Sequence, residues 1–98
     1  DKAVEKHWKK PDALDRLRKL RDALDGIEEW THDPLKGAVE ALANAANEGL
    51  GKWVHPLRLA LTGKSVGPGL FELTELLGRS TTQVRIDRAM AFIENNLE

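Results

Sequence analysis

Residues 55–72 restrict the fold more than any other part of the sequence, because one helix ends and another begins within them. Pro56 suits the first turn of a helix, and Gly63 can take the left-handed conformation that ends one. Residues 67–69, Gly-Pro-Gly, then begin a second apolar helix, which ends at Gly78. The sequence therefore predicts two short helices that meet at a sharp corner.

Apolar residues recur at helical spacing through the rest of the chain. The first run predicts a core-facing helix over residues 12–26, and the second predicts a helix over residues 33–49 that Pro34 opens. Ser80 and Gln83 form a capping box before the last helix. Because no segment alternates with period two, we expect an all-α fold: a compact bundle or cage of about five or six helices, several of them short.

The composition is that of a soluble helical domain with one modest core. The chain has 98 residues, of which 41% are hydrophobic and 32% charged, and no apolar run is long enough to span a membrane. It has no cysteine, which excludes disulfides and thiolate catalysis and suits a cytoplasmic protein. Because it starts without a methionine, we expect it to be a piece of a longer protein.

The charges are unevenly distributed, although the net charge is only −1. Residues 49–71 contain no Asp or Glu, and their cationic or titratable side chains are Lys52, His55, Arg58 and Lys64. A basic segment in a nearly neutral protein indicates a few contacts with phosphates or bases rather than a long groove. The alternative is a chance cluster without a ligand.

Three residues of this segment have two possible roles each. Arg58 follows Pro56 closely, so we expect it in the first helical turn, where its planar donors can read a base edge; it could equally be a structural cation. Trp53 could stack on a base or belong to the core. His55 could contact RNA, or cap the helix and pack against it.

Other motifs do not support catalysis or metal binding. Residues 62–65 resemble the end of a phosphate-binding loop, but Arg58 stands where that loop requires a glycine. The residue types of a nucleophilic triad occur in residues 31–33, yet sequence neighbours cannot adopt triad geometry. The three histidines are too far apart in sequence for a local metal motif, so we expect no catalytic residue and no metal.

Three short matches lie in the central segment. Residues 56–63 read Pro-Leu-Arg-Leu-Ala-Leu-Thr-Gly, residues 68–72 read Pro-Gly-Leu-Phe-Glu, and residues 77–78 read Leu-Gly. Together they resemble the C-terminal anticodon-binding region of bacterial-type glutamyl-tRNA synthetases, which are class I glutamate–tRNA ligases. The resemblance is strongest over residues 51–78, and the pair Arg85-Ile86 also fits it.

This resemblance implies which residues contact RNA. Arg58 would donate to one of the second and third anticodon bases, Leu70 would pack against one, and the backbone around Gly67 would hydrogen-bond another. The single domain would comprise connecting helices over residues 1–30 and an anticodon-recognising subdomain over residues 31–98. The first anticodon base would be read by a part that precedes this chain.

The predicted function is therefore anticodon recognition within a glutamate–tRNA ligase. The expected partners are the anticodon loop of tRNA(Glu) and the upstream domains of the same protein, and we expect a monomer. Ligation with ATP and Mg would take place in a catalytic domain outside these residues, so no cofactor is expected here. The alternative is a small helical protein-interaction module without RNA binding, in which helices over residues 12–25 and 70–77 present a groove to a partner helix.

Overall fold

The computed structural model describes residues 12–64 and 69–96. They form four helices: α2 (Ala13–Asp25), α3 (His32–Ala45), α4 (Gly51–Thr62) and α5 (Leu70–Asn96). The described residues contain no strand, so the prediction of an all-α fold is confirmed. The five or six helices that we expected are slightly more than the four found, partly because α5 continues through Gly78.

Gly78 interrupts α5 at the predicted position. Its backbone angles, φ 82° and ψ 163°, are not helical and lie in a region that glycine alone adopts readily. The break divides α5 into two arms, residues 70–77 and residues 79–96, and both arms contribute buried side chains.

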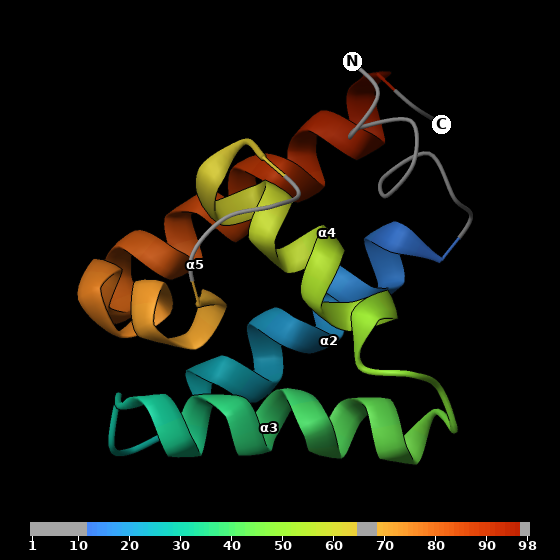
Figure 1. The fold of residues 1–98 in the computed structure, drawn as a ribbon. Coiled ribbons are helices and arrows are strands. Elements are labelled where there is room, and N and C mark those ends of the chain that lie inside the picture. Colours follow the sequence, from blue (N-terminus) through green and yellow to red (C-terminus); the bar gives the residue numbers. More distant parts are fainter. Residues whose placement is uncertain (1–11, 65–68, 97–98) are drawn as a thin grey trace.

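All four helices contact one another and share one hydrophobic core. In Figure 1, α3 runs along one side of the molecule, α5 crosses the opposite side, and α2 and α4 lie between them. The largest fully buried apolar side chains come from every helix: Leu17, Leu20, Leu24, Leu35, Val39, Trp53, Leu57, Leu61 and Ile86. Because this packing covers the leucine face of α2, that face is not the open groove that the protein-interaction alternative requires. Among the described helices, none is both long and apolar enough to cross a membrane.

The start of α3 differs from the prediction. The helix begins at His32 with Thr31 as its N-cap, so Pro34 is its third residue. The backbone N–H of His32 donates to the Glu75 carboxylate of α5 at 2.7 Å. This tertiary contact satisfies one of the N–H groups that a helix start leaves unpaired.

The end of α3 also differs, since the helix stops at Ala45 and not at Gly49. Asn47 takes the left-handed conformation with φ 55°, and the N–H of Glu48 bonds to the carbonyl of Ala43 at 2.9 Å. This is the Schellman arrangement, and asparagine tolerates its left-handed position better than most residues. The turn brings Glu48 out of α3 and towards α2.

α4 begins about one turn earlier than expected, at Gly51, and Pro56 lies inside it. The prediction that Pro56 and Arg58 lie in the first turn is therefore wrong. A proline inside a helix removes one backbone hydrogen bond, but Pro56 is buried on the inner face, and this packing offsets the loss. Gly63 ends α4 as predicted, with φ 76° and its N–H bonded to the carbonyl of Leu59 at 2.8 Å.

Gln83 does not form the predicted capping box with Ser80. Its side-chain N–H donates to the carbonyl of Arg21 in α2 at 3.2 Å, and its side-chain oxygen has no partner. Gln83 is buried on the side of α5 that packs on α2, so its amide bonds to that helix instead.

Arg79 ties the connection after α2 to the second arm of α5. Its guanidinium donates to the carbonyl of Asp25 at 2.8 Å and also to the carbonyl of Ile27. The same group lies 4.9 Å from the ring centre of Trp30. The α2–α3 connection is thus held against α5 by one side chain that no local sequence pattern singled out.

Candidate nucleic-acid interface

Basic side chains lie along α4. Lys52, His55 and Arg58 follow one another at three-residue spacing, which places them on one side of a helix. Lys52 and His55 are exposed, and Arg58 is half-buried. Lys64, also exposed, follows the end of the helix. The structure therefore brings four of the predicted site residues to one side and one end of α4.

Thr62 shapes the turn between this side of α4 and Lys64. Its hydroxyl oxygen lies 2.9 Å from the carbonyl oxygens of both Arg58 and Lys64, and it accepts the N–H of Lys64 at 3.0 Å. These contacts hold the backbone of Lys64 against the last turn of α4. Gly67, which we expected to offer backbone hydrogen bonds, lies outside the described residues.

Trp53 and Leu70 lie in the core instead of at the surface. Trp53 is 2% exposed and Leu70 is 3% exposed. Trp53 neighbours the exposed Lys52 in sequence but is turned about 100° around the helix, onto the inner side. Base stacking requires an exposed ring face, so the structure favours the core alternative for Trp53. Burial also leaves at most an edge of Leu70 for a base.

A cavity of about 420 Å³ opens between the end of α4 and the second arm of α5. Residues 59–63 line one side, and the other side is lined by Arg85, Arg88, Ala89 and Phe92. Arg85 donates a hydrogen bond to the carbonyl of Leu61, and none of the lining residues is acidic. We did not predict Arg88 as a site residue, although the spacing of residues 85, 88 and 92 places them on one face of a helix.

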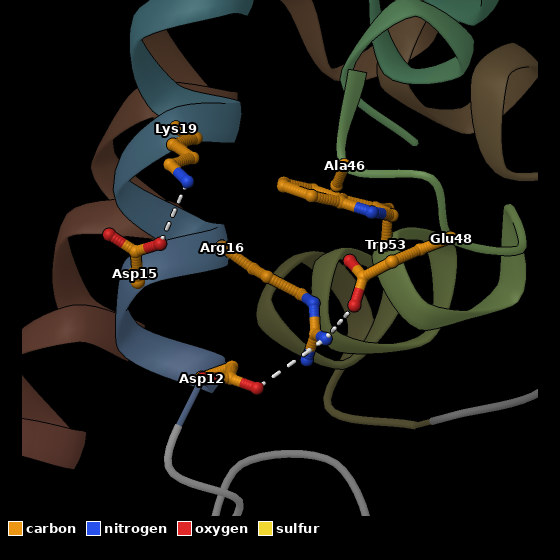
Figure 2. A pocket seen from close by; sticks show the side chains of 7 residues that line it. All are labelled: Asp12, Asp15, Arg16, Lys19, Ala46, Glu48 and Trp53. Atoms are coloured by element: carbon orange, nitrogen blue, oxygen red, sulfur yellow. Dashed lines mark hydrogen bonds and ion pairs between the residues drawn. The ribbon is translucent and has the colours of Figure 1, made fainter. Parts of the chain in front are cut away.

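A smaller cavity of about 230 Å³ lies beside α2 and the start of α4. Figure 2 shows its lining side chains: Asp12, Asp15, Arg16, Lys19, Ala46, Glu48 and Trp53. Arg16 points into it and pairs with Glu48 at 2.8 Å and with Asp12 at 3.8 Å. Because three of the lining side chains are acidic and two are basic, this cavity disfavours a phosphate, unlike the cavity beside α5.

Glu48 links this smaller cavity to the basic side of α4. The hydrogen bond from Arg16 lowers the pKa of Glu48, partial burial opposes that shift, and the charges of Arg16 and Lys52 add to it. The carboxylate lies 3.9 Å from the Lys52 ammonium. Lys52 is therefore partly neutralised, which makes it a weaker candidate for contacts with an anion.

Neither metal binding nor a triad finds support in the described part of the chain. No three His, Asp or Glu side chains of residues 12–64 and 69–96 gather closely enough to hold a metal ion. His32 and Asp33 contact each other at 2.8 Å, but they are adjacent residues at the start of α3. This arrangement gives the imidazole an acidic neighbour without any separate element to complete a triad.

Comparisons with known proteins point to one family. The family model described as "Anticodon binding domain" matches residues 1–90. The glutamate–tRNA ligase of Moorella thermoacetica is 39% identical over 97 residues, which cover 99% of this chain and 20% of that protein. The glutamate–tRNA ligase of Myxococcus xanthus is 39% identical over 90 residues, which cover 92% of this chain and 19% of that protein.

A solved structure shares the fold. The crystal structure of a glutamate tRNA ligase from Elizabethkingia meningosepticum, in complex with its amino acid, matches with a TM-score of 0.88 at 31% identity. The match covers 100% of this chain and 18% of that one, and the chain spans about a fifth of the length of the curated relatives named above. The chain therefore belongs to the anticodon binding domain family, and the relatives that it matches are glutamate–tRNA ligases.

Proposed function

We propose that this chain recognises the anticodon loop of tRNA(Glu) as one domain of a glutamate–tRNA ligase. The observation that carries the proposal is the basic side of α4, with Lys52, His55 and Arg58, in a chain that belongs to an anticodon-binding family. Residues 49–71 contain no acid, so this segment attracts an RNA backbone without repulsion from within it.

The residues of this surface would contact different parts of the RNA, because their side chains differ in chemistry. Arg58 is half-buried, which restricts the orientation of its guanidinium, and paired donors in a fixed plane suit a base edge. Lys52 and Lys64 are exposed ammonium groups, which suit phosphates and position the RNA without reading its sequence. His55 lies between Lys52 and Arg58 in sequence on the same side of α4 and can add a polar contact.

The start of α5 would hold a second base. The side chain of Leu70 is buried, whereas Gly69 is exposed beside it. The first N–H groups of a helix have no partner within that helix and can donate to a base. The Glu72 carboxylate lies beside Gly69 in the first turn of α5 and disfavours a phosphate there. Among the described residues, Gly69 and an edge of Leu70 are the surfaces that the second base would contact. The contact with the backbone around Gly67 rests on the resemblance alone, because Gly67 lies outside the described residues.

The ligation itself, with ATP and Mg, would be carried out by a catalytic domain outside these residues. Residues 1–30 would connect the upstream domains to the anticodon-recognising residues 31–98. α2 lies within the connecting part, yet its leucines belong to the same core as the other helices. The connection at α2 would therefore be rigid, in a protein that we propose to be a cytoplasmic monomer.

An NMR titration tests the proposed function. The anticodon stem-loop of tRNA(Glu) is added to the ¹⁵N-labelled chain, and the amide shifts of residues 52–64 are compared with those of α3, which lies across the molecule from the end of α4 in Figure 1. We expect the largest shifts in residues 52–64 and smaller ones for a stem-loop with a changed third anticodon base. No shifts, or shifts confined to α3, would contradict the proposal.

A further inference from the structure

The cavity between the end of α4 and the second arm of α5 is open to the surface and has basic and apolar walls. Its volume of about 420 Å³ lies within the range of about 300–1,000 Å³ that is typical of small-ligand sites. Its walls combine apolar side chains with two arginines, and no acidic residue lines it. It shares no lining residue with the series Lys52, His55 and Arg58 on α4.

The two arginines of this cavity have different partners. Arg85 donates to the carbonyl of Leu61, which holds its guanidinium in place and offsets the partial negative charge at the end of α4. Arg88 is exposed and forms no ion pair within the described part of the chain. Arg88 can therefore contact an anionic group without breaking an ion pair to any of the described residues.

The two sides of the cavity differ in their side chains. The α4 side is mainly apolar, with Leu59, Ala60 and Leu61. The carbonyls of Leu59 and Leu61 already accept hydrogen bonds from the N–H of Gly63 and from Arg85. The α5 side carries Arg88, which attracts a phosphate, and Phe92, which is 42% exposed and adds aromatic surface. A nucleotide matches this side of the cavity, because its phosphate carries a negative charge and its base has a flat aromatic face.

Thr62 connects this cavity to the proposed anticodon surface. It lines the cavity, and its hydroxyl lies 2.9 Å from the carbonyl oxygen of Arg58. Thr62 lies one helical turn beyond Arg58, so the cavity begins next to the turn that carries Arg58.

We propose that the cavity binds a nucleotide adjacent to the anticodon in the same tRNA loop, with its phosphate on Arg88 and its base against Phe92. This inference rests on the RNA recognition proposed above and adds a contact that positions the loop. Because a phosphate contact and stacking tolerate every base, the site strengthens binding without reading the anticodon.

The test measures the affinity of two stem-loops, the tRNA(Glu) anticodon stem-loop and one with a changed third anticodon base. Arg88→Ala should weaken both equally and reduce the slope of log affinity against log salt by about 0.7. Phe92→Leu should weaken both by roughly 5- to 100-fold, whereas Phe92→Tyr, which keeps an aromatic face, should bind like the wild type. Arg18→Ala is the control, since Arg18 is exposed on α2 and lines neither cavity.

A second arm identifies the bound nucleotide. The nucleotide immediately before or after the anticodon is made abasic in two separate stem-loops. For one of them, wild type and Phe92→Leu should bind with equal affinity, because the base that contacts Phe92 is gone. If a difference between the two proteins persists with both abasic stem-loops, no base adjacent to the anticodon contacts Phe92, and the inference is wrong.

The remaining outcomes separate the two proposals. If the Arg88 and Phe92 variants bind like the wild type while Arg58→Ala weakens binding, the cavity is not a nucleotide site and the anticodon proposal stands. If the wild type binds neither stem-loop, both proposals are wrong. If Arg88→Ala or Phe92→Leu changes the ratio of the two affinities, the cavity reads the anticodon, which contradicts the positioning role.

Discussion

Arg85 of the second arm of α5 donates a hydrogen bond to the carbonyl of Leu61 in the last turn of α4. The last carbonyls of a helix lack partners within the helix, and a charged donor satisfies one of them strongly. The contact joins the helix that carries Arg58 to the terminal helix, just before the turn that leads to Lys64. The end of α4 is therefore supported from outside the helix.

Replacing this donor should destabilise the domain. Arg85→Ala leaves the Leu61 carbonyl without its partner, so we expect the free energy of unfolding to fall by about 1–3 kcal/mol. Urea denaturation measures the change. Arg88→Ala is the matched control, because Arg88 is exposed, and it should stay within about 0.5 kcal/mol of the wild type. Equal losses for both variants would show that the contact with Leu61 does not support the fold.

Arg58 is the residue that we expect to discriminate between anticodons. Arg58→Ala should cost about 1–3 kcal/mol of binding to the tRNA(Glu) stem-loop and reduce discrimination at one base. Arg58→Lys should recover little, because an ammonium keeps the charge but loses the paired donors. Titration of two stem-loops that differ in the third anticodon base measures both effects.

Two results would contradict base reading by Arg58. An unchanged ratio of the two affinities in both variants would mean that Arg58 contacts only the RNA backbone. A collapse of the thermal midpoint in Arg58→Ala would show that the half-buried Arg58 is a structural cation.

Glu48 makes part of the stability depend on pH. The hydrogen bond from Arg16, followed by the charges of Arg16 and Lys52, lowers the pKa of Glu48 below its ordinary value of 4.5. A lowered folded-state pKa contributes stability that is fully present above pH 4.5 and is lost as the pH falls through the folded-state pKa. Glu48→Gln should therefore be less stable than the wild type at pH 7, and the difference should shrink in acid. Thermal melts of both proteins between pH 7 and pH 3 measure this difference in stability. A difference that does not change with pH would contradict the role of the Glu48 carboxylate.

Gly78 and Gly37 should respond in opposite directions to alanine. Gly78 has φ 82° and ψ 163°, and a Cβ there would meet no atom within 4 Å, so Gly78→Ala tests backbone strain alone. We expect a loss of about 1–3 kcal/mol. Gly37 lies within α3, and its Cβ would also meet no atom within 4 Å, so Gly37→Ala should stabilise the domain by about 0.5–1 kcal/mol. Chemical denaturation of both variants measures the change in the free energy of unfolding. If Gly78→Ala is as stable as the wild type, the fold does not require a glycine at the break in α5.

The sequence by itself determined the helical class and several helix ends. The leucine spacing predicted α2 almost to the residue, and Gly63 and Gly78 both interrupt helices as expected. These features are local: a glycine at a positive φ lowers the energy of a turn whatever packs around it. The prediction failed at Gly49, because Asn47 takes the left-handed position two residues earlier.

Tertiary structure alone decided which residues are accessible and which helix ends are supported from elsewhere. Trp53 lies within the basic segment of the sequence, yet α4 turns its ring into the core. Pro56 stays inside α4 because burial of that face outweighs the lost backbone hydrogen bond. The cavity with Arg85 and Arg88 forms where α5 crosses the end of α4. Arg85 contacts Leu61, which is 24 positions away in the sequence. Contacts at such separation depend on how whole helices pack, and no local pattern of residue types encodes that packing.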